Sequence, residues 1–236
     1  NDAYALSATA RTAILDAYSQ KSWAYLAREE RHRFPVARDL ALHIHEPGSV
    51  WAAQRLTPPD WFAQMEASPQ YARQFTHMLY ELHIPLADEL AKALDMTGVR
   101  RLMDLGGGSG VMSLALLRRH PDLVSVIIDI ESVCVAGREI AAKHPEGDRI
   151  TYHVADFFHD ELPGGFDLVL DCDAGDYSAG LFRRLQAVLN PGGRLVIVDQ
   201  FALEKGVAPA SRLHWSFLGS LDHPDFSFLT AAEVKA

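Results

Sequence analysis

The chain has 236 residues, of which 48% are hydrophobic and 22% are charged. This composition is ordinary for a folded protein with a buried core, and it excludes disordered, collagen-like and coiled-coil chains. Lys and Arg number 22 against 31 Asp and Glu, and the net charge of −9 disfavours nucleic acids and anionic membranes as partners. The two cysteines, Cys134 and Cys172, lie in apolar runs and predict buried thiols in a reducing compartment.

From the sequence we expect neither a signal peptide nor a membrane-spanning run. Its first residues lack a basic and an apolar region, and no stretch reaches about 18 uninterrupted apolar residues. We therefore expect a cytoplasmic protein. The chain begins without Met and stops at Ala236, in what is predicted as the first turns of a helix capped by Thr230, so we expect both ends to be trimmed.

Residues 1–97 are predicted to form an all-α region. Apolar residues recur there at helical spacing, and Pro and Gly residues separate the runs. The predicted helices cover 10–18, 22–31, 36–43, 61–65 and 69–96.

Residues 98–236 are predicted to form an α/β domain. Short β-rich runs cover 101–105, 123–130, 149–154, 166–171 and 194–199. Helical patterns alternate with them at 110–119, 132–143 and 178–189. This alternation is typical of βαβ units, and it predicts a Rossmann-like parallel sheet with helices on both faces.

A glycine-rich loop follows the first predicted strand. The nicotinamide fingerprint G-x-G-x-x-G fails there, because its third glycine position holds Val111. The spacing acid-x-G-x-G-x-G fits, through Asp104, Gly106, Gly108 and Gly110. Glycines at such a turn let the backbone approach a ligand closely. A plain glycine-rich turn is the alternative.

Two further acids end predicted strands. Asp129, followed by Ile130, ends the second strand, where a carboxylate can accept both hydroxyls of a ribose. Asp156 follows the third strand and precedes Phe157, an acid and an aromatic ring that suit the amino group and the face of an adenine. The alternatives are a solvated strand end for Asp129 and a helix N-cap for Asp156.

From about residue 51 onward the chain resembles the small-molecule O-methyltransferases, class I enzymes dependent on S-adenosylmethionine (SAM) that join a winged-helix dimerisation region to a Rossmann-like domain. The matching segments, besides the glycine loop, are His120-Pro-Asp-Leu, Asp129-Ile-Glu, Ala155-Asp-Phe-Phe and Asn190-Pro-Gly-Gly. The resemblance implies SAM as the cofactor. The glycine loop would bind it, together with Asp129, Ile130, Asp156 and Phe157. It also implies a small aromatic acceptor and a homodimer, with most of the winged-helix region and the family's last two strands missing.

The resemblance also implies residues at the substrate. Met78, in the long helix predicted over 69–96, falls where the family has a methionine that faces the sulfonium and the acceptor. His214, Trp215 and Phe217 align with the helix that lines the family's substrate pocket. Such a mixed face suits a flat aromatic ligand, and ordinary core or interface packing is the alternative.

The family's catalytic histidine falls, counted back from the Asn190 turn, on Asp171, and its neighbouring acid falls on Cys172. Methyl transfer tolerates this loss, because the sulfonium is an excellent leaving group and positioning alone supplies up to about 7–11 kcal/mol. Asp171, His77 and His214 are therefore the candidate bases or substrate anchors.

Other functions remain open from the sequence. Relatives that lack the histidine include C-methylating, hydroxylating and decarboxylating members, and a degenerate scaffold that dimerises or senses a ligand is a further possibility. A metal-assisted variant would use Asp171, Asp173 and His214, although no metal is predicted. His43-x-His45-Glu46 is better explained as a solvated loop.

Overall fold

The structure is a computed structural model, and it describes residues 5–43, 50–58, 60–174, 177–205, 207, 212–222 and 226–235. No helix among these residues is both long enough and apolar enough to cross a membrane. Two compact units alternate along the chain. The sheet unit comprises Asn1–Ala27 and Phe62–Ile197, and the helical unit comprises Arg28–Trp61 and Val198–Ala236.

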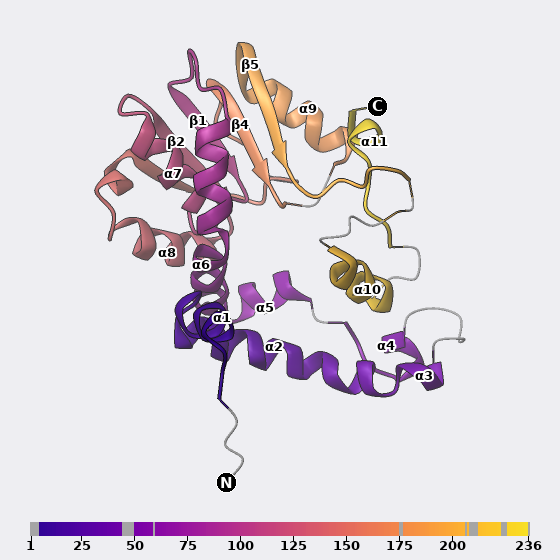
Figure 1. The fold of residues 1–236 in the computed structure, drawn as a ribbon. Coiled ribbons are helices and arrows are strands. Elements are labelled where there is room, and N and C mark those ends of the chain that lie inside the picture. Colours follow the sequence, from indigo (N-terminus) through magenta and orange to yellow (C-terminus); the bar gives the residue numbers. More distant parts are fainter. Residues whose placement is uncertain are drawn as a thin grey trace. The chain divides into compact units, whose positions relative to one another are not determined.

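The residues that precede the sheet are helical, which confirms the predicted α-helical region (Figure 1). The helices are α1 Ala8–Arg11, the π-helical turn η1 Thr12–Asp16, α2 Gln20–Arg38, α3 Leu40–His43, α4 Val50–Ala53, α5 Trp61–Ala67 and α6 Pro69–Ala93. The predicted separation of helices 22–31 and 36–43 is wrong, because α2 continues through Pro35 and the Asp39 N–H donates to the Pro35 carbonyl to close the last turn. The division of the chain at residue 98 stays a prediction.

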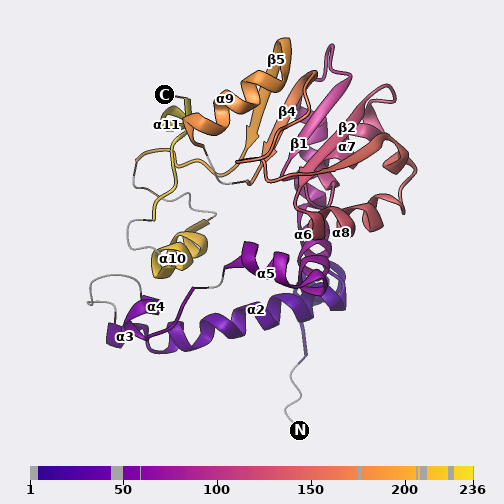
Figure 2. The same ribbon diagram turned by 180° about the vertical axis from the view of Figure 1, so that it is seen from behind.

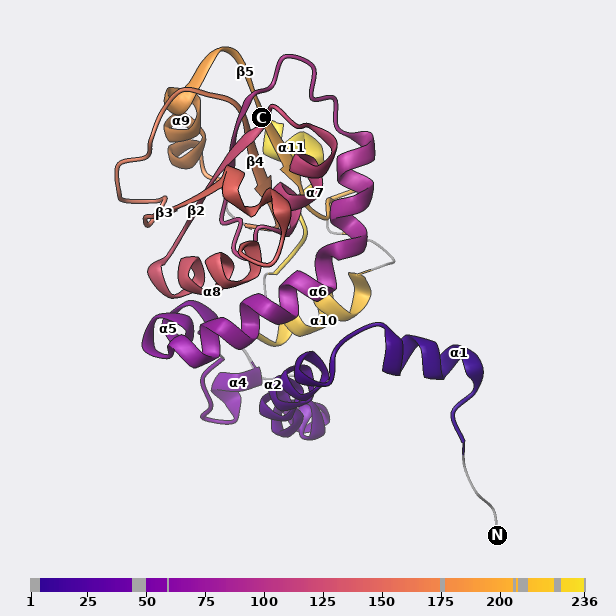
Figure 3. The ribbon, with the colours of Figure 1, turned by 90° about the vertical axis from the view of Figure 1, so that its left-hand side faces the viewer.

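The long helix α6 begins where the sequence predicts. The Ser68 hydroxyl accepts a hydrogen bond from the Tyr71 N–H, and Pro69 occupies the first turn, where its missing N–H costs nothing. Small buried residues mark one face of the helix, namely Ala72, Thr76, Ala87 and Ala91. They let α6 pack closely against α7 (Val111–Arg119) and α8 (Glu131–Ala141), as Figure 3 shows.

The sheet has five strands in the order β3-β2-β1-β4-β5, and β1 pairs in parallel with β2 and β4, as β2 does with β3. The strands are β1 Arg101–Leu105, β2 Val124–Asp129, β3 Ile150–Val154, β4 Phe166–Cys172 and β5 Leu189–Val198. Leu105 lies opposite Ile128 on one side and Asp171 on the other. The carboxyl ends of β1, β2 and β4 therefore meet at one edge of the sheet, which is where ligands bind in open α/β folds.

Helices cover both faces of the sheet, as predicted (Figures 1 and 2). Met103 and Leu105 pack with Leu181 and Leu185 of α9 (Ala179–Val188) on one face. Ile127, Cys134, Ala141 and Tyr152 form a cluster with α8 on the other, and a 3-10 helix at Pro145–Arg149 leads into β3. Cys134 is buried as predicted, whereas Cys172 is only half-buried because it ends its strand.

The fifth strand begins earlier than the predicted 194–199. It includes the Asn190-Pro-Gly-Gly segment, and the Asn190 amide donates to Asp167 Oδ1 of β4 at 2.8 Å. Asp167 Oδ2 also accepts from the backbone N–H groups of Arg100 and Arg101, so this one side chain joins β4 both to β5 and to the start of β1. Pro191 is tolerated because β5 is an edge strand of the described sheet.

The helical unit has its own small core of Val36, Val50, Trp51 and Leu221. Its last two helices are α10 Leu213–Asp222 and α11 Ala231–Lys235. Thr230 caps α11 as predicted: its hydroxyl accepts from the Glu233 N–H, and Glu233 Oε2 accepts in return from the Thr230 N–H. This reciprocal pair is a capping box.

Candidate functional site

The glycine loop connects β1 to α7 at the carboxyl edge of the sheet. Gly106, Gly108 and Gly110 have φ values of 61°, 47° and 73°, in the left-handed region that glycine adopts without strain. The Gly106 N–H donates to the Ile128 carbonyl at 2.8 Å, and the Gly110 N–H donates to the Gly107 carbonyl at 2.8 Å. The alternate glycines of the sequence pattern are therefore the positions where this backbone needs glycine.

Asp104 lies fully buried beneath the loop. Its Oδ2 accepts a hydrogen bond from the Ser113 hydroxyl of α7 at 2.5 Å, and Ser113 Oγ lies 2.7 Å from Ser125 Oγ of β2. A Cβ atom on Gly107 would lie only 2.5 Å from the Asp104 carboxyl carbon, so the loop sits directly on this side chain. Burial raises the pKa of Asp104 to about 6, although the bond from Ser113 acts in the opposite direction.

Asp129 lies beside the loop at the end of β2. Its Oδ2 accepts from the Gly108 N–H at 3.0 Å and its Oδ1 accepts from the Ile130 N–H at 2.8 Å. Burial raises the pKa of Asp129 to about 6, and the two backbone hydrogen bonds partly offset this effect. The side chain predicted to hold a ribose is thus fixed next to the loop that would carry the rest of the ligand.

Asp156 and Phe157, which follow β3, make different contacts. Asp156 Oδ1 accepts from the Phe158 N–H at 2.9 Å, and Oδ2 lies 2.7 Å from His159 Nδ1, contacts that lower the pKa of Asp156. This carboxylate therefore stabilises its own turn, and its contact with an adenine stays a prediction. Phe157 instead reaches the loop, with Cε1 3.7 Å from the position that a Cβ of Gly106 would take.

The end of β4 borders the same loop. Asp171 is fully buried opposite Leu105, and Ala174 Cβ lies 3.7 Å from the position that a Cβ of Gly106 would take. Between them Asp173 has a φ of 59°, which is uncommon for any residue but glycine. The residues at which the resemblance puts the catalytic group are thus next to the glycine loop.

Helix α6 contributes two predicted residues. Met78 is buried. His77 Nε2 lies 3.9 Å from Glu139 Oε2 of α8, which also forms an ion pair of 2.6 Å with Arg73. Burial lowers the pKa of His77, and the positive charges of Lys143 and Arg73 add to this effect. The His77 ring therefore contacts α8, and its catalytic role stays a prediction.

A third residue of α6, His83, was not predicted. Its Nδ1 lies 3.0 Å from the Leu79 carbonyl oxygen, and its Nε2 lies 4.0 Å from Asp173 Oδ2. Helical spacing puts His83 on the same face of α6 as the buried Thr76 and Ala87, so the sequence could predict that His83 faces the protein. The sequence could not predict that His83 lies near the end of β4.

Comparison with known proteins decides the family. The sequence model of the O-methyltransferase domain family matches residues 44–220 of this chain. The chain belongs to the O-methyltransferase domain family. The resemblance found from the glycine loop and the segments after it is thereby confirmed.

Two curated relatives indicate the range of this family. The chain is 33% identical over 183 residues to 3-hydroxy-5-methyl-1-naphthoate 3-O-methyltransferase of Streptomyces sahachiroi. The matched segment covers 66% of this chain and 52% of the relative. The chain is 26% identical over 155 residues to L-tyrosine C(3)-methyltransferase of Streptomyces lavendulae, covering 64% of this chain and 42% of that one. The chain spans about half the length of these relatives.

A solved structure shares the fold. Human N-acetylserotonin methyltransferase in complex with SAM superimposes with a TM-score of 0.72 at 20% sequence identity, over 92% of this chain and 62% of that chain. This likeness confirms the α/β architecture of the O-methyltransferase domain.

The predicted substrate helix corresponds to α10 in the helical unit. Trp215 and Phe217 are exposed, at 42% and 45%, and the His214 side chain lies outside the described residues. Their contact with an acceptor stays a prediction.

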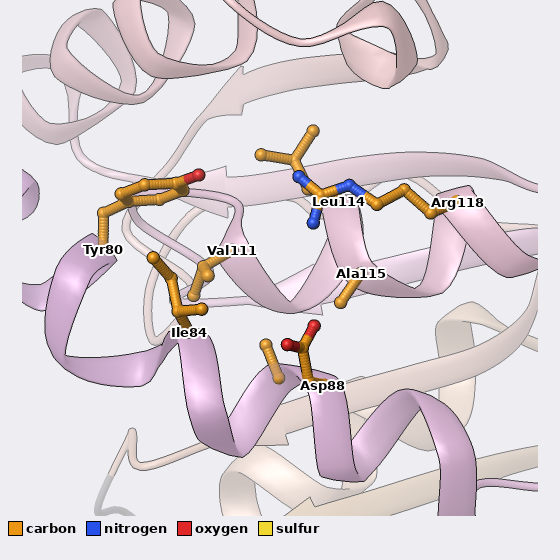
Figure 4. Close-up of a pocket in the computed structure, with 8 residues that line it drawn as sticks. Tyr80, Ile84, Asp88, Val111, Leu114, Ala115 and Arg118 are labelled. Atoms are coloured by element: carbon orange, nitrogen blue, oxygen red, sulfur yellow. The ribbon is translucent and has the colours of Figure 1, made fainter.

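A small pocket lies between α6 and α7 (Figure 4), and none of the predicted site residues lines it. Its lining comprises Tyr80, Ile84, Ala87, Asp88, Val111, Leu114, Ala115 and Arg118. The volume of about 80 Å³ is well below the roughly 300–1,000 Å³ of typical ligand sites. We therefore do not assign the cofactor or the acceptor to this pocket.

No group of three or more His, Cys, Asp or Glu side chains in the described parts of the chain is arranged to hold a metal ion. The metal-assisted alternative that includes His214 is not tested by this finding, because that side chain is not described. His45 and Glu46 also lie outside the described residues.

Proposed function

We propose that this O-methyltransferase domain transfers a methyl group from SAM to an oxygen atom of a small aromatic metabolite. The observation that carries the proposal is the glycine loop, which has three left-handed glycines and whose Gly108 N–H donates to the Asp129 carboxylate. Membership of the family supports the reaction class. The Streptomyces sahachiroi relative, named for a hydroxynaphthoate acceptor, supports the substrate class.

The residues around the loop fit SAM. Gly106 and Gly108 carry no side chain at the points where Phe157 and Asp129 approach, each within 3.7 Å of the position that a Cβ would take. Asp129 would accept the ribose hydroxyls, and the Phe157 ring offers an apolar face to the adenine. When bound, SAM supplies an electrophilic methyl group on a sulfur that leaves as a neutral thioether.

Asp171 is the proposed acceptor anchor among the sequence candidates. Its burial at the end of β4, beside the loop, supports a position near the transferred methyl group. We keep Met78, Trp215 and Phe217 as proposed contacts of the acceptor. Positioning of the acceptor oxygen in line with the carbon–sulfur bond would supply most of the acceleration.

A second candidate is methylation of carbon. The L-tyrosine C(3)-methyltransferase of Streptomyces lavendulae is among the relatives, and Asp171 stands where the resemblance puts the histidine of the O-methylating members. Methyl-labelled SAM, incubated with hydroxynaphthoates, phenols, catechols and tyrosine, tests both reactions. Label on oxygen supports the first candidate, label on carbon supports the second, and label retained on the sulfonium contradicts both.

We further propose a cytoplasmic homodimer in which residues 1–97 supply the dimerisation region and a lid over the substrate, and residues 98–236 bind SAM. The exposed apolar side chains Leu82, Ile84 and Leu86 of α6 support a protein interface. Light scattering after size exclusion tests the dimer, and a monomer at every concentration would contradict it.

A further inference from the structure

The pair formed by His83 and Asp173 joins α6 to the residue that follows β4. His83 Nε2 lies 4.0 Å from Asp173 Oδ2. The next residue, Ala174, lies 3.7 Å from the position that a Cβ of Gly106 would take. The pair therefore borders the loop to which the proposed function assigns SAM.

The His83 ring is held in one orientation. Its Nδ1 lies 3.0 Å from the Leu79 carbonyl oxygen, and a carbonyl oxygen only accepts hydrogen bonds. Nδ1 must therefore carry the proton of the neutral imidazole. The lone pair then resides on Nε2, the nitrogen that lies nearest Asp173, and this nitrogen is the basic one.

Asp173 holds a backbone conformation that few residues adopt. Its φ of 59° lies in the left-handed region, where Asp and Asn are the most tolerated residues after glycine. Uncommon backbone conformations of this kind cluster at functional sites. The side chain is 59% exposed while that of His83 is 19% exposed, so the pair lies at the border between the packed sheet unit and solvent.

We propose that His83 is the general base of the methyl transfer and that Asp173 is its positioning residue. The resemblance puts the family's catalytic histidine at Asp171, at the same end of β4 as Asp173. Because this chain has no histidine there, His83 of α6 would supply the base. This inference rests on the proposed function, because it assigns a residue to that reaction.

The proton and electrons of the step balance as follows. His83 Nε2 takes the proton of the acceptor hydroxyl, while a lone pair of that oxygen bonds to the methyl carbon. The carbon–sulfur electron pair passes to sulfur and neutralises the sulfonium. The imidazolium forms 4.0 Å from the Asp173 carboxylate, which stabilises its charge, and it then loses the proton to water.

Three variants test the assignment. Because a general base contributes about 10²–10⁴-fold, we expect His83→Gln to lower kcat by about a hundredfold or more and to leave the affinity for S-adenosylhomocysteine unchanged. Asp173→Asn keeps the backbone conformation and removes the charge, so we expect a loss of about tenfold. The double variant should lose no more than His83→Gln, because Asp173 acts through His83. His32→Ala, which removes an exposed histidine of α2, is the matched control.

The ring itself gives a readout that needs no cofactor. In the ligand-free protein, long-range nitrogen–proton spectra should show His83 as the Nδ1-protonated tautomer, and the Nε2-protonated tautomer would overturn the proposal. Unchanged kcat in His83→Gln, with turnover intact in the unaltered chain, would overturn this inference alone. Turnover that is missing from the unaltered chain with every acceptor tried would contradict the proposed function and the inference together.

Discussion

Ser113 Oγ of α7 donates a hydrogen bond of 2.5 Å to Asp104 Oδ2 of β1, and this bond fixes the start of the helix to the strand beneath the glycine loop. The carboxylate is fully buried, and its Oδ1 has no hydrogen-bond partner in the described residues. Loss of the one hydroxyl would leave a buried acid without compensation.

Ser113→Ala should therefore destabilise the protein. We expect the free energy of unfolding to fall by about 1–3 kcal/mol, the cost of leaving a buried polar group unsatisfied. Urea unfolding measures this loss. Ser220→Ala, at an exposed position of α10, is the control, and an equal, small effect of both variants would contradict the role of the buried bond.

Asp104 should also make stability depend on pH. Its folded-state pKa of about 6 lies above the unfolded value of about 3.9, so the unfolded state releases its proton first as pH rises. The contribution of Asp104 to stability is thus present below about pH 4 and is lost towards pH 6, by on the order of 3 kcal/mol. Asp104→Asn should flatten this part of the unfolding profile, and a profile with the same slope as the unaltered chain would contradict it.

Gly108→Val should abolish binding of SAM and retain the fold. A β-branched residue is strained at a φ of 47°, and its Cβ would lie 3.7 Å from Asp129 Oδ2, the group proposed to hold the ribose. Calorimetry with S-adenosylhomocysteine and circular dichroism measure the two effects. Gly164→Ala is the control, because a Cβ there meets nothing within 4 Å, and unchanged affinity in Gly108→Val would disprove the loop assignment.

Asp171→Asn should lower turnover more than it lowers cofactor affinity. The side chain ends β4 beside the loop and would contact the acceptor, whereas the ribose contact is proposed for Asp129. Steady-state kinetics and calorimetry on the same preparation separate the effects. Equal losses in both would assign Asp171 a structural role.

The sequence predicts the sheet and the glycine loop because both depend on local patterns. Strands covered on both faces have apolar runs, and a loop with left-handed positions has glycines at those positions, as at Gly106 and Gly108. The position of Asp129 could be predicted for the same reason, since this residue directly ends β2.

Contacts between distant segments could not be predicted. The pairing of His83 with Asp173 joins α6 to the residue after β4, and no local spacing in the sequence encodes it. Asp156 combines an acid with a following aromatic, but a carboxylate that caps its own turn has the same local sequence as one that awaits a ligand. The two units alternate along the chain, so composition alone does not delimit them.

The SAM site at the glycine loop is tested most directly by isothermal titration calorimetry with S-adenosylhomocysteine, the demethylated form of SAM. The titration compares the unaltered chain with Asp129→Asn. We expect saturable binding by the unaltered chain and an affinity about tenfold to a hundredfold weaker in the variant, because a hydrogen bond to a charged group is worth about 1.5–3 kcal/mol. Asn still accepts from the Gly108 N–H, so the loop should keep its conformation. No binding by the unaltered chain, or equal affinity in the two proteins, would contradict a SAM site at this loop.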